Sequence, residues 1–97
     1  MSSQAIGLEL SLDEWRILEF LTRKDSISSN ELARELQIDD RVVLDSLHVL
    51  HYEGLVYFIA QYLGTPEEVV SRITKKGVET LRVKAAAHYT RIKATTG

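Results

Sequence analysis

The amino-acid sequence predicts an α+β domain that is mainly helical, with three helices in its first half, a two-stranded β-hairpin and a long last helix. Apolar residues at helical spacing fill the first half, β-forming residues follow at 55–60, and a basic segment follows Thr74. A chain of 97 residues has room for one modest core and forms one domain. We expect the core and hairpin at residues 11–74 and the last helix at residues 75–93.

The first helix is expected over residues 13–24. Ser11 is a suitable N-cap, and Glu14 stands three residues later, which matches a capping box. Arg23 and Lys24 fall in the predicted last turn, where cations favour the negative end of the helix dipole. The apolar residues of this segment form a broad face for the core: Trp15, Ile17, Leu18, Phe20 and Leu21.

Two further helices follow, joined by a tight turn. Ser28 or Ser29 caps the second, which has its body at residues 31–36, and Asp39 caps the third, which runs over residues 40–52. The second helix is short and the third is longer, as in a helix-turn-helix. Their apolar residues predict one buried line: Leu32, Leu36, Val43, Leu47 and Leu50.

The hairpin is predicted from β-forming residues on both sides of a turn. Gly54 ends the third helix in a left-handed conformation, and strands follow at 55–60 and 69–73. Thr74 caps the last helix, and residues 94–97 are expected to fray. The weak alternation of residues 6–10 is compatible with a short edge strand.

Composition excludes several classes of protein. No apolar run approaches the roughly 18 residues that span a bilayer, and the first 11 residues lack the features of a signal peptide. The absence of cysteine excludes disulfides, thiolate zinc sites and cysteine nucleophiles. No nucleophile–base pair, phosphate loop or paired carboxylates are recognisable. We therefore expect a cytoplasmic protein that is no enzyme and binds no cofactor, metal or membrane.

The net charge of −2 hides a strong asymmetry. Residues 1–71 carry five Lys/Arg against 13 Asp/Glu, a net charge of −8, whereas residues 72–97 carry seven Lys/Arg against Glu79 alone, a net charge of +6. This polarity favours a basic surface that meets a polyanion. A solvated basic helix is the alternative.

Several motifs together resemble one family. The sequence LHYEGLV at 50–56 is preceded by SSNELARELQI and followed, at 73–77, by ITKKG. This order resembles the winged helix-turn-helix regulators, and it is closest to small archaeal and bacterial proteins of the multiple-antibiotic-resistance-regulator type. The segment SLDEWRIL at 11–18 also looks like the opening of their first helix. The resemblance covers residues 10–82.

The resemblance implies a homodimer that binds double-stranded DNA. Each subunit would lay its third helix in a major groove and its hairpin, the wing, along the backbone. Carried over to this sequence, base-edge contacts would come from Arg41, Val42, Asp45 and His48. Phosphate contacts would come from Ser28, Ser29 and Asn30 and from Arg72, and Lys75 and Lys76 would draw in the backbone.

The third helix and the wing tip depart from that pattern because they are acidic. A typical reading helix presents Ser, Arg, Gln, Asn or Lys, whereas this one presents Asp45 beside a single arginine, and the wing tip carries Glu67 and Glu68. Each acidic group near a phosphate costs on the order of 1 kcal/mol in water. This departure favours an alternative function, a winged helix that binds another protein.

The last helix carries a pattern typical of a helix–helix contact. Val78, Leu81, Ala85, His88 and Ile92 recur with spacings of three and four. We therefore expect homodimerisation through this helix, against the alternative that it folds back on its own domain. The predicted interface residues are Leu81, Ala85, His88, Tyr89 and Ile92.

Two smaller groups have a functional and a structural interpretation. His48 and His51, with Asp45, have the spacing of metal ligands on a helix, but such histidines are more often surface residues. The aromatic residues near the end of the third helix are a possible stacking platform, although one face of that strand belongs to the core: Tyr52, Tyr57, Phe58 and Tyr62.

Overall fold

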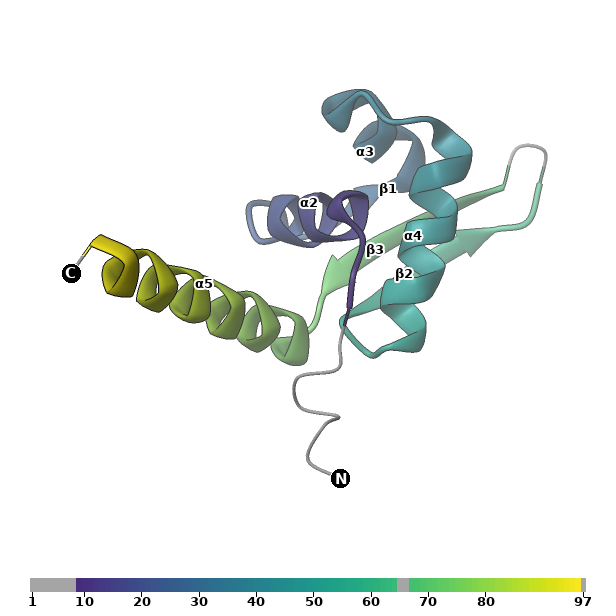
Figure 1. The fold of residues 1–97 in the computed structure, drawn as a ribbon. Helices are drawn as coiled ribbons and strands as arrows, with labels where there is room; N and C mark the ends of the chain where they lie inside the picture. Colours follow the sequence, from purple (N-terminus) through teal and green to yellow (C-terminus); the bar gives the residue numbers. More distant parts are fainter. Residues whose placement is uncertain (1–8, 65–66, 97) are drawn as a thin grey trace.

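The computed structural model describes residues 9–64 and 67–96, with only the backbone of residues 86–96. Three helices pack against one face of a small sheet, the hairpin extends to one side, and the last helix leaves the body of the domain on the other (Figure 1). The elements are α2 (Leu12–Leu21), β1 (Ile27–Ser28), α3 (Ser29–Leu36), α4 (Asp40–Tyr52), β2 (Val56–Tyr62), β3 (Glu68–Ile73) and α5 (Lys75–Thr96). The predicted α+β, mainly helical class is confirmed.

Helix α2 begins where predicted and ends earlier. Its capping box is complete, since Ser11 Oγ accepts from the backbone N–H of Glu14 at 3.1 Å and Glu14 Oε1 accepts from that of Ser11 at 2.9 Å. The predicted end at residue 24 is wrong. The Thr22 hydroxyl donates to the Glu19 carbonyl at 2.6 Å, and Thr22 is the C-cap. A hydroxyl that donates a hydrogen bond to a carbonyl of its own helix competes with the backbone N–H groups that would extend the helix.

The capping residues between α3 and α4 follow the prediction closely. Of the two candidate serines, Ser28 is the cap of α3, because its hydroxyl accepts from the Glu31 N–H at 3.2 Å. Asp39 Oδ1 accepts from the Arg41 N–H at 2.8 Å at the start of α4. Gly54 has a φ of 80°, the predicted left-handed residue after α4.

The sheet has three antiparallel strands in the order β1-β3-β2. Strand β1 was not predicted, because its two residues are too few to show alternation; Ile27 lies opposite Ser71. In the hairpin the register shifts between Phe58 and Ala60, which makes Ile59 a β-bulge. The edge strand predicted at residues 6–10 lies mostly outside the described residues, and Glu9 and Leu10 belong to no strand.

One hydrophobic core joins all three helices to the sheet. Of the predicted buried line, Leu36 is half-buried at the rim and the other four residues are fully buried. Side chains from β1, β2 and β3 complete the core: Ile27, Val56 and Val69. None of the helices in the described part of the chain is both long and apolar enough to cross a bilayer.

The root of α5 is fixed by the loop that follows α4. Thr74 caps α5 as predicted, because its hydroxyl accepts from the Gly77 N–H at 3.0 Å, and it also donates to the Gly54 carbonyl at 2.7 Å. A Cβ at Gly77 would lie 2.4 Å from the Leu55 carbonyl oxygen. Only glycine allows this close approach, which sets the direction of α5. The helix continues to Thr96, beyond the predicted end at residue 93.

Candidate nucleic-acid interface

The exposed face of α4 carries all four residues predicted to meet base edges. Arg41, Val42, Asp45 and His48 are exposed and lie on the side of α4 away from the core. Arg41 Nε lies 3.9 Å from Asp45 Oδ1, one turn along the helix. The guanidinium is therefore partly neutralised by its own helix, although both side chains remain open to solvent.

A groove of about 650 Å³ separates the first half of α4 from the wing tip. It contains four carboxylates and a single guanidinium, so its field disfavours a polyanion. Its lining residues come from α4, the turn before it and the wing: Asp39, Asp40, Arg41, Leu44, Asp45, His48, Gly64 and Glu67.

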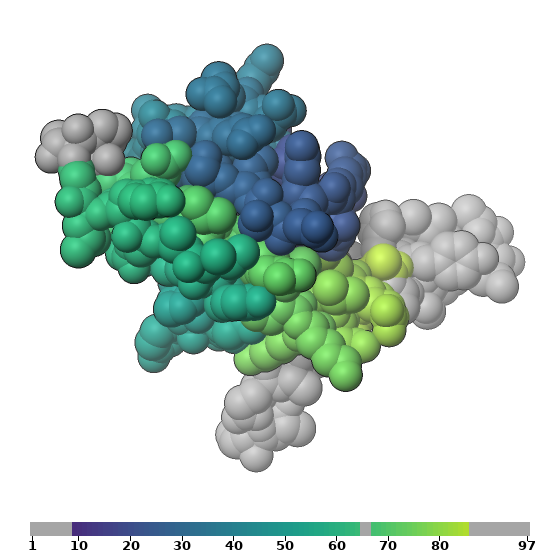
Figure 2. Space-filling view, turned by 180° about the vertical axis from the view of Figure 1, so that it is seen from behind, coloured from purple at the N-terminus to yellow at the C-terminus, as the bar shows by residue number. Residues whose placement is uncertain are grey.

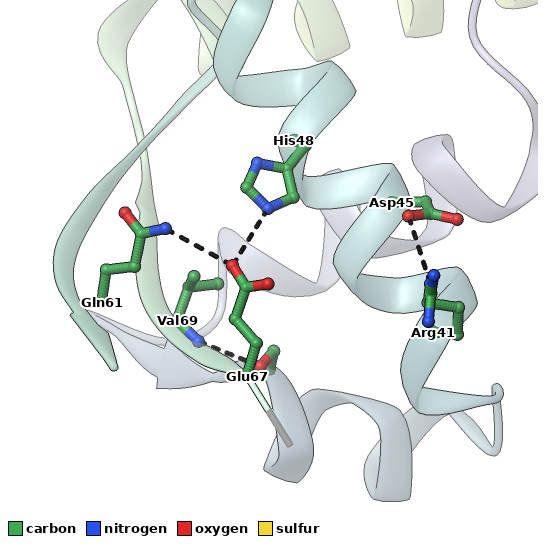
Figure 3. Close-up of polar contacts among 7 residues, drawn as sticks. Arg41, Asp45, His48, Gln61, Glu67 and Val69 are labelled. Atoms are coloured by element: carbon green, nitrogen blue, oxygen red, sulfur yellow. Dashed lines mark hydrogen bonds and ion pairs between the residues drawn. The ribbon is translucent and has the colours of Figure 1, made fainter. Parts of the chain in front are cut away.

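The wing tip is tied to α4 across this groove (Figure 3). Glu67 points from the wing toward His48 on α4, and its Oε2 lies 3.6 Å from His48 Nε2. The side-chain amide of Gln61 donates to the same oxygen at 3.4 Å. The contact between His48 and Glu67 joins residues 19 positions apart in different elements, so local sequence patterns gave no sign of it.

The aromatic group near the end of α4 is arranged differently from a stacking platform. The Phe58 ring stacks on the imidazole of His51 at a centroid distance of 4.3 Å and meets the edge of His48 at 5.4 Å. The three tyrosines of the predicted platform are exposed: Tyr52, Tyr57 and Tyr62. No group of three His, Asp or Glu residues in the described ranges is placed to hold a metal ion.

The three residues at the amino end of α3 have different environments. Ser29 is 1% exposed, and its hydroxyl accepts a hydrogen bond from the Val69 N–H of β3 at 3.2 Å. This side chain therefore faces the sheet and joins α3 to the wing. Ser28 and Asn30 are half-buried and reach the surface. The sequence predicted Ser29 as a phosphate contact beside Ser28 and gave no indication that its side chain is buried against the sheet.

The basic residues at the end of the wing and at the start of α5 lie at the other end of α4 from Arg41. Arg72 is exposed on β3 opposite Tyr57, and Lys75 is exposed at the start of α5. The Lys76 ammonium donates to the carbonyl oxygen of Glu53, the C-cap of α4, at 2.8 Å. In the space-filling view from behind, the surface of the hairpin continues into the first turns of α5 (Figure 2).

Helix α5 and α2 border a second groove of about 600 Å³. Leu81 is half-buried and packs against the core, and Ala85 is exposed beside it. The groove is mostly apolar, with charged residues at its rim: Glu19, Thr22, Val78, Leu81, Arg82, Lys84 and Ala85. His88, Tyr89 and Ile92 lie in the helical part of α5 whose side chains are outside the described residues.

No protein-family model and no curated protein sequence matches this chain. Solved structures match it over most of its length. RV1404 from Mycobacterium tuberculosis aligns with 97% of the chain, with a TM-score of 0.77 and 18% identity. MepR, a transcription regulator of the Staphylococcus aureus multidrug efflux pump MepA, aligns with 97%, with a TM-score of 0.72 and 16% identity. FabT of Streptococcus pneumoniae, solved in complex with DNA, aligns with 90%, with a TM-score of 0.64 and 17% identity.

The chain has the winged helix-turn-helix fold. The resemblance inferred from residues 10–82 is thereby confirmed for the fold. In this winged helix, α3 and α4 form the helix-turn-helix, and the hairpin of β2 and β3 is the wing. The chain spans 63%, 69% and 60% of the lengths of RV1404, MepR and FabT.

Proposed function

We propose that the chain is a DNA-binding transcriptional regulator of the cytoplasm that lays α4 in a major groove and its wing along the backbone. The observation that carries this proposal is the match of 90% of the chain to FabT, which was solved in complex with DNA. A winged helix of this kind reads base edges with its second helix while its hairpin contacts the backbone. The four side chains predicted to meet base edges are exposed on α4, as such a role requires.

The proposed contacts follow from the chemistry of the exposed side chains. Arg41 can donate two hydrogen bonds to the O6 and N7 atoms of guanine, while Val42 suits a thymine methyl group. His48 and Asp45 lie on the same face. At the amino end of α3, the Ser28 hydroxyl accepts from a backbone N–H and keeps its own proton to donate. Asn30, Arg72 and Lys75 complete the proposed phosphate contacts, whereas the Lys76 ammonium is bonded to the Glu53 carbonyl oxygen.

We also propose that the regulator is a homodimer joined through α5. The helix runs over 22 residues, and Figure 1 shows its far half leaving the body of the domain. The apolar groove beside Leu81 and Ala85 supports a contact at this position. The proposed interface then continues through His88, Tyr89 and Ile92. Sedimentation in solution tests it: a monomer at about 100 µM would contradict the dimer.

A gel-shift titration tests DNA binding. Fragments of the source genome should be retarded at about 50 mM salt, and the affinity should fall steeply by about 200 mM. Arg41→Ala should weaken binding by at least about tenfold if it removes one bidentate base contact. Arg82→Ala is the matched control, because Arg82 is also exposed and paired with a carboxylate on its own helix, Glu79 at 3.0 Å. No retarded complex at about 50 mM salt would overturn the proposed function.

One observation favours a second function, the binding of another protein. The exposed face of α4 carries apolar side chains beside the acidic groove, with Val42 38%, Val49 41% and Tyr52 87% exposed. Exposed apolar residues rimmed by charge are typical of protein interfaces. A purified partner that binds with defined stoichiometry, competes with DNA and is lost on Val49→Asp would support this alternative.

A further inference from the structure

The contact of Glu67 with His48 and Gln61 lies where DNA would bind if α4 and the wing both contact it. This inference therefore rests on the proposed function. One carboxylate oxygen receives both contacts, at 3.6 Å from His48 Nε2 and 3.4 Å from Gln61 Nε2 (Figure 3). The two nitrogens come from α4 and from the wing, the two elements between which a DNA backbone would pass. An anionic oxygen thus already lies in that passage.

A phosphate oxygen and a carboxylate oxygen are recognised by the same donors. An amide N–H and an imidazole N–H bind either anion. Glu67 is 38% exposed and His48 45% exposed in their side chains, so both can exchange partners with a ligand from solvent. The charged groups that face this place from α4 and the turn before it are mostly acidic: Asp39, Asp40, Arg41 and Asp45.

We propose that His48 and Gln61 form a binding site for one DNA phosphate and that Glu67 fills this site in the free protein. The wing carboxylate is an autoinhibitory contact. DNA binds when a phosphate displaces Glu67 from the two donors, and the displaced carboxylate remains close by and repels the backbone. The acidic wing tip therefore lowers DNA affinity in a defined way and keeps the wing docked on α4 in the absence of DNA.

The experiment compares two neighbouring glutamates in the full chain on a retarded DNA fragment. Glu67→Gln removes the charge at the site, and removal of one like charge at close range predicts about fivefold tighter binding. Glu68→Gln changes the net charge by the same amount, but Glu68 pairs with Tyr62 across the hairpin and precedes the buried Val69, so it faces away from α4. We expect Glu68→Gln to change the dissociation constant by less than about twofold.

A double-mutant cycle separates the site from general charge. In a His48→Ala background, Glu67→Gln should gain less than it gains in the native background, because one of the two phosphate donors is missing. Equal effects of Glu67→Gln and Glu68→Gln in the native background would overturn the inference and leave the proposed function standing. A full gain that persists without His48 would also overturn it. No complex with any variant would overturn the proposed function and this inference together.

Discussion

Lys76, in the first turn of α5, caps the C-terminal end of α4: its ammonium donates a hydrogen bond to the carbonyl oxygen of Glu53 at 2.8 Å. The last carbonyls of a helix have no partner within it, and a cation is favoured at that end. The sequence pattern predicted Lys75 and Lys76 as equivalent phosphate contacts. Their surroundings differ, because only Lys76 is bonded to the end of α4 in the described structure.

The two lysines are therefore expected to respond differently to substitution. Lys76→Met should lower the free energy of unfolding by about 1 kcal/mol, the value of one hydrogen bond, and should weaken DNA binding little. Lys75→Met should leave stability unchanged and weaken DNA binding. Urea unfolding and fluorescence anisotropy measure the two effects. If both variants lose affinity equally at full stability, the structural role of Lys76 is wrong.

Two glycines near the root of α5 provide a second test. At Gly77 an added Cβ would lie 2.4 Å from the Leu55 carbonyl oxygen and 2.7 Å from Ile73 Cγ1. Gly77→Ala should destabilise the fold by about 2–3 kcal/mol, because the backbone must move. Gly54 has a φ of 80°, and an added Cβ there would be in ordinary van der Waals contact with the Lys76 side chain, at 3.7 Å from Nζ. Gly54→Ala should cost about 1 kcal/mol from the backbone conformation alone. Equal costs in urea unfolding would contradict the close packing at Gly77.

Two buried serines differ in whether their hydroxyl has a partner. The Ser29 hydroxyl accepts from the Val69 N–H at 3.2 Å, whereas the Ser71 hydroxyl is buried without a hydrogen-bond partner among the described residues. Ser29→Ala should cost about 2 kcal/mol, since a buried N–H loses its acceptor. Ser71→Ala should be neutral or slightly stabilising, because it removes an unsatisfied polar group. Thermal unfolding of both variants and of the native protein measures these effects. A larger loss of stability for Ser71→Ala than for Ser29→Ala would contradict the hydrogen bond assigned to Ser29.

The proposed dimer predicts which face of α5 tolerates charge. Ala85→Glu should shift the protein to monomers in sedimentation equilibrium, because Ala85 lies on the proposed interface. Val83→Glu is the control: Val83 is 64% exposed and lies two residues, more than half a turn, away from that line. Val83→Glu removes a larger apolar side chain than Ala85→Glu does. If dissociation came from a general loss of apolar surface, Val83→Glu would therefore dissociate the dimer more. Dissociation by Val83→Glu and not by Ala85→Glu would place the contact on another face.

The sequence predicted those parts of the fold that depend on neighbouring residues. The caps at Ser11, Asp39 and Thr74 and the left-handed Gly54 are local, and each is present. Strand β1 was missed because two residues carry no periodicity. The end of α2 was misplaced because a threonine hydroxyl bonds backward to Glu19.

The candidate site was less predictable, because its contacts join distant parts of the chain. The exposed residues of α4 followed from helical periodicity. The burial of Ser29 depends on Val69, 40 residues away, and the tie between His48 and Glu67 depends on how the wing folds over α4. Neither partner of these pairs has a local signature. Such contacts can be found only once the register of the sheet is known.

The β-bulge at Ile59 determines which side chains of the wing face α4. In an uninterrupted strand, Tyr57, Ile59 and Gln61 would share one face. The extra residue advances the alternation by one step, so that Gln61 lies opposite the buried Val69 and reaches Glu67. A strand without the bulge that kept Ile59 in the ladder would turn Gln61 outward with the same residues at the site. The register of β2, and not only its composition, therefore specifies what an incoming DNA backbone would meet.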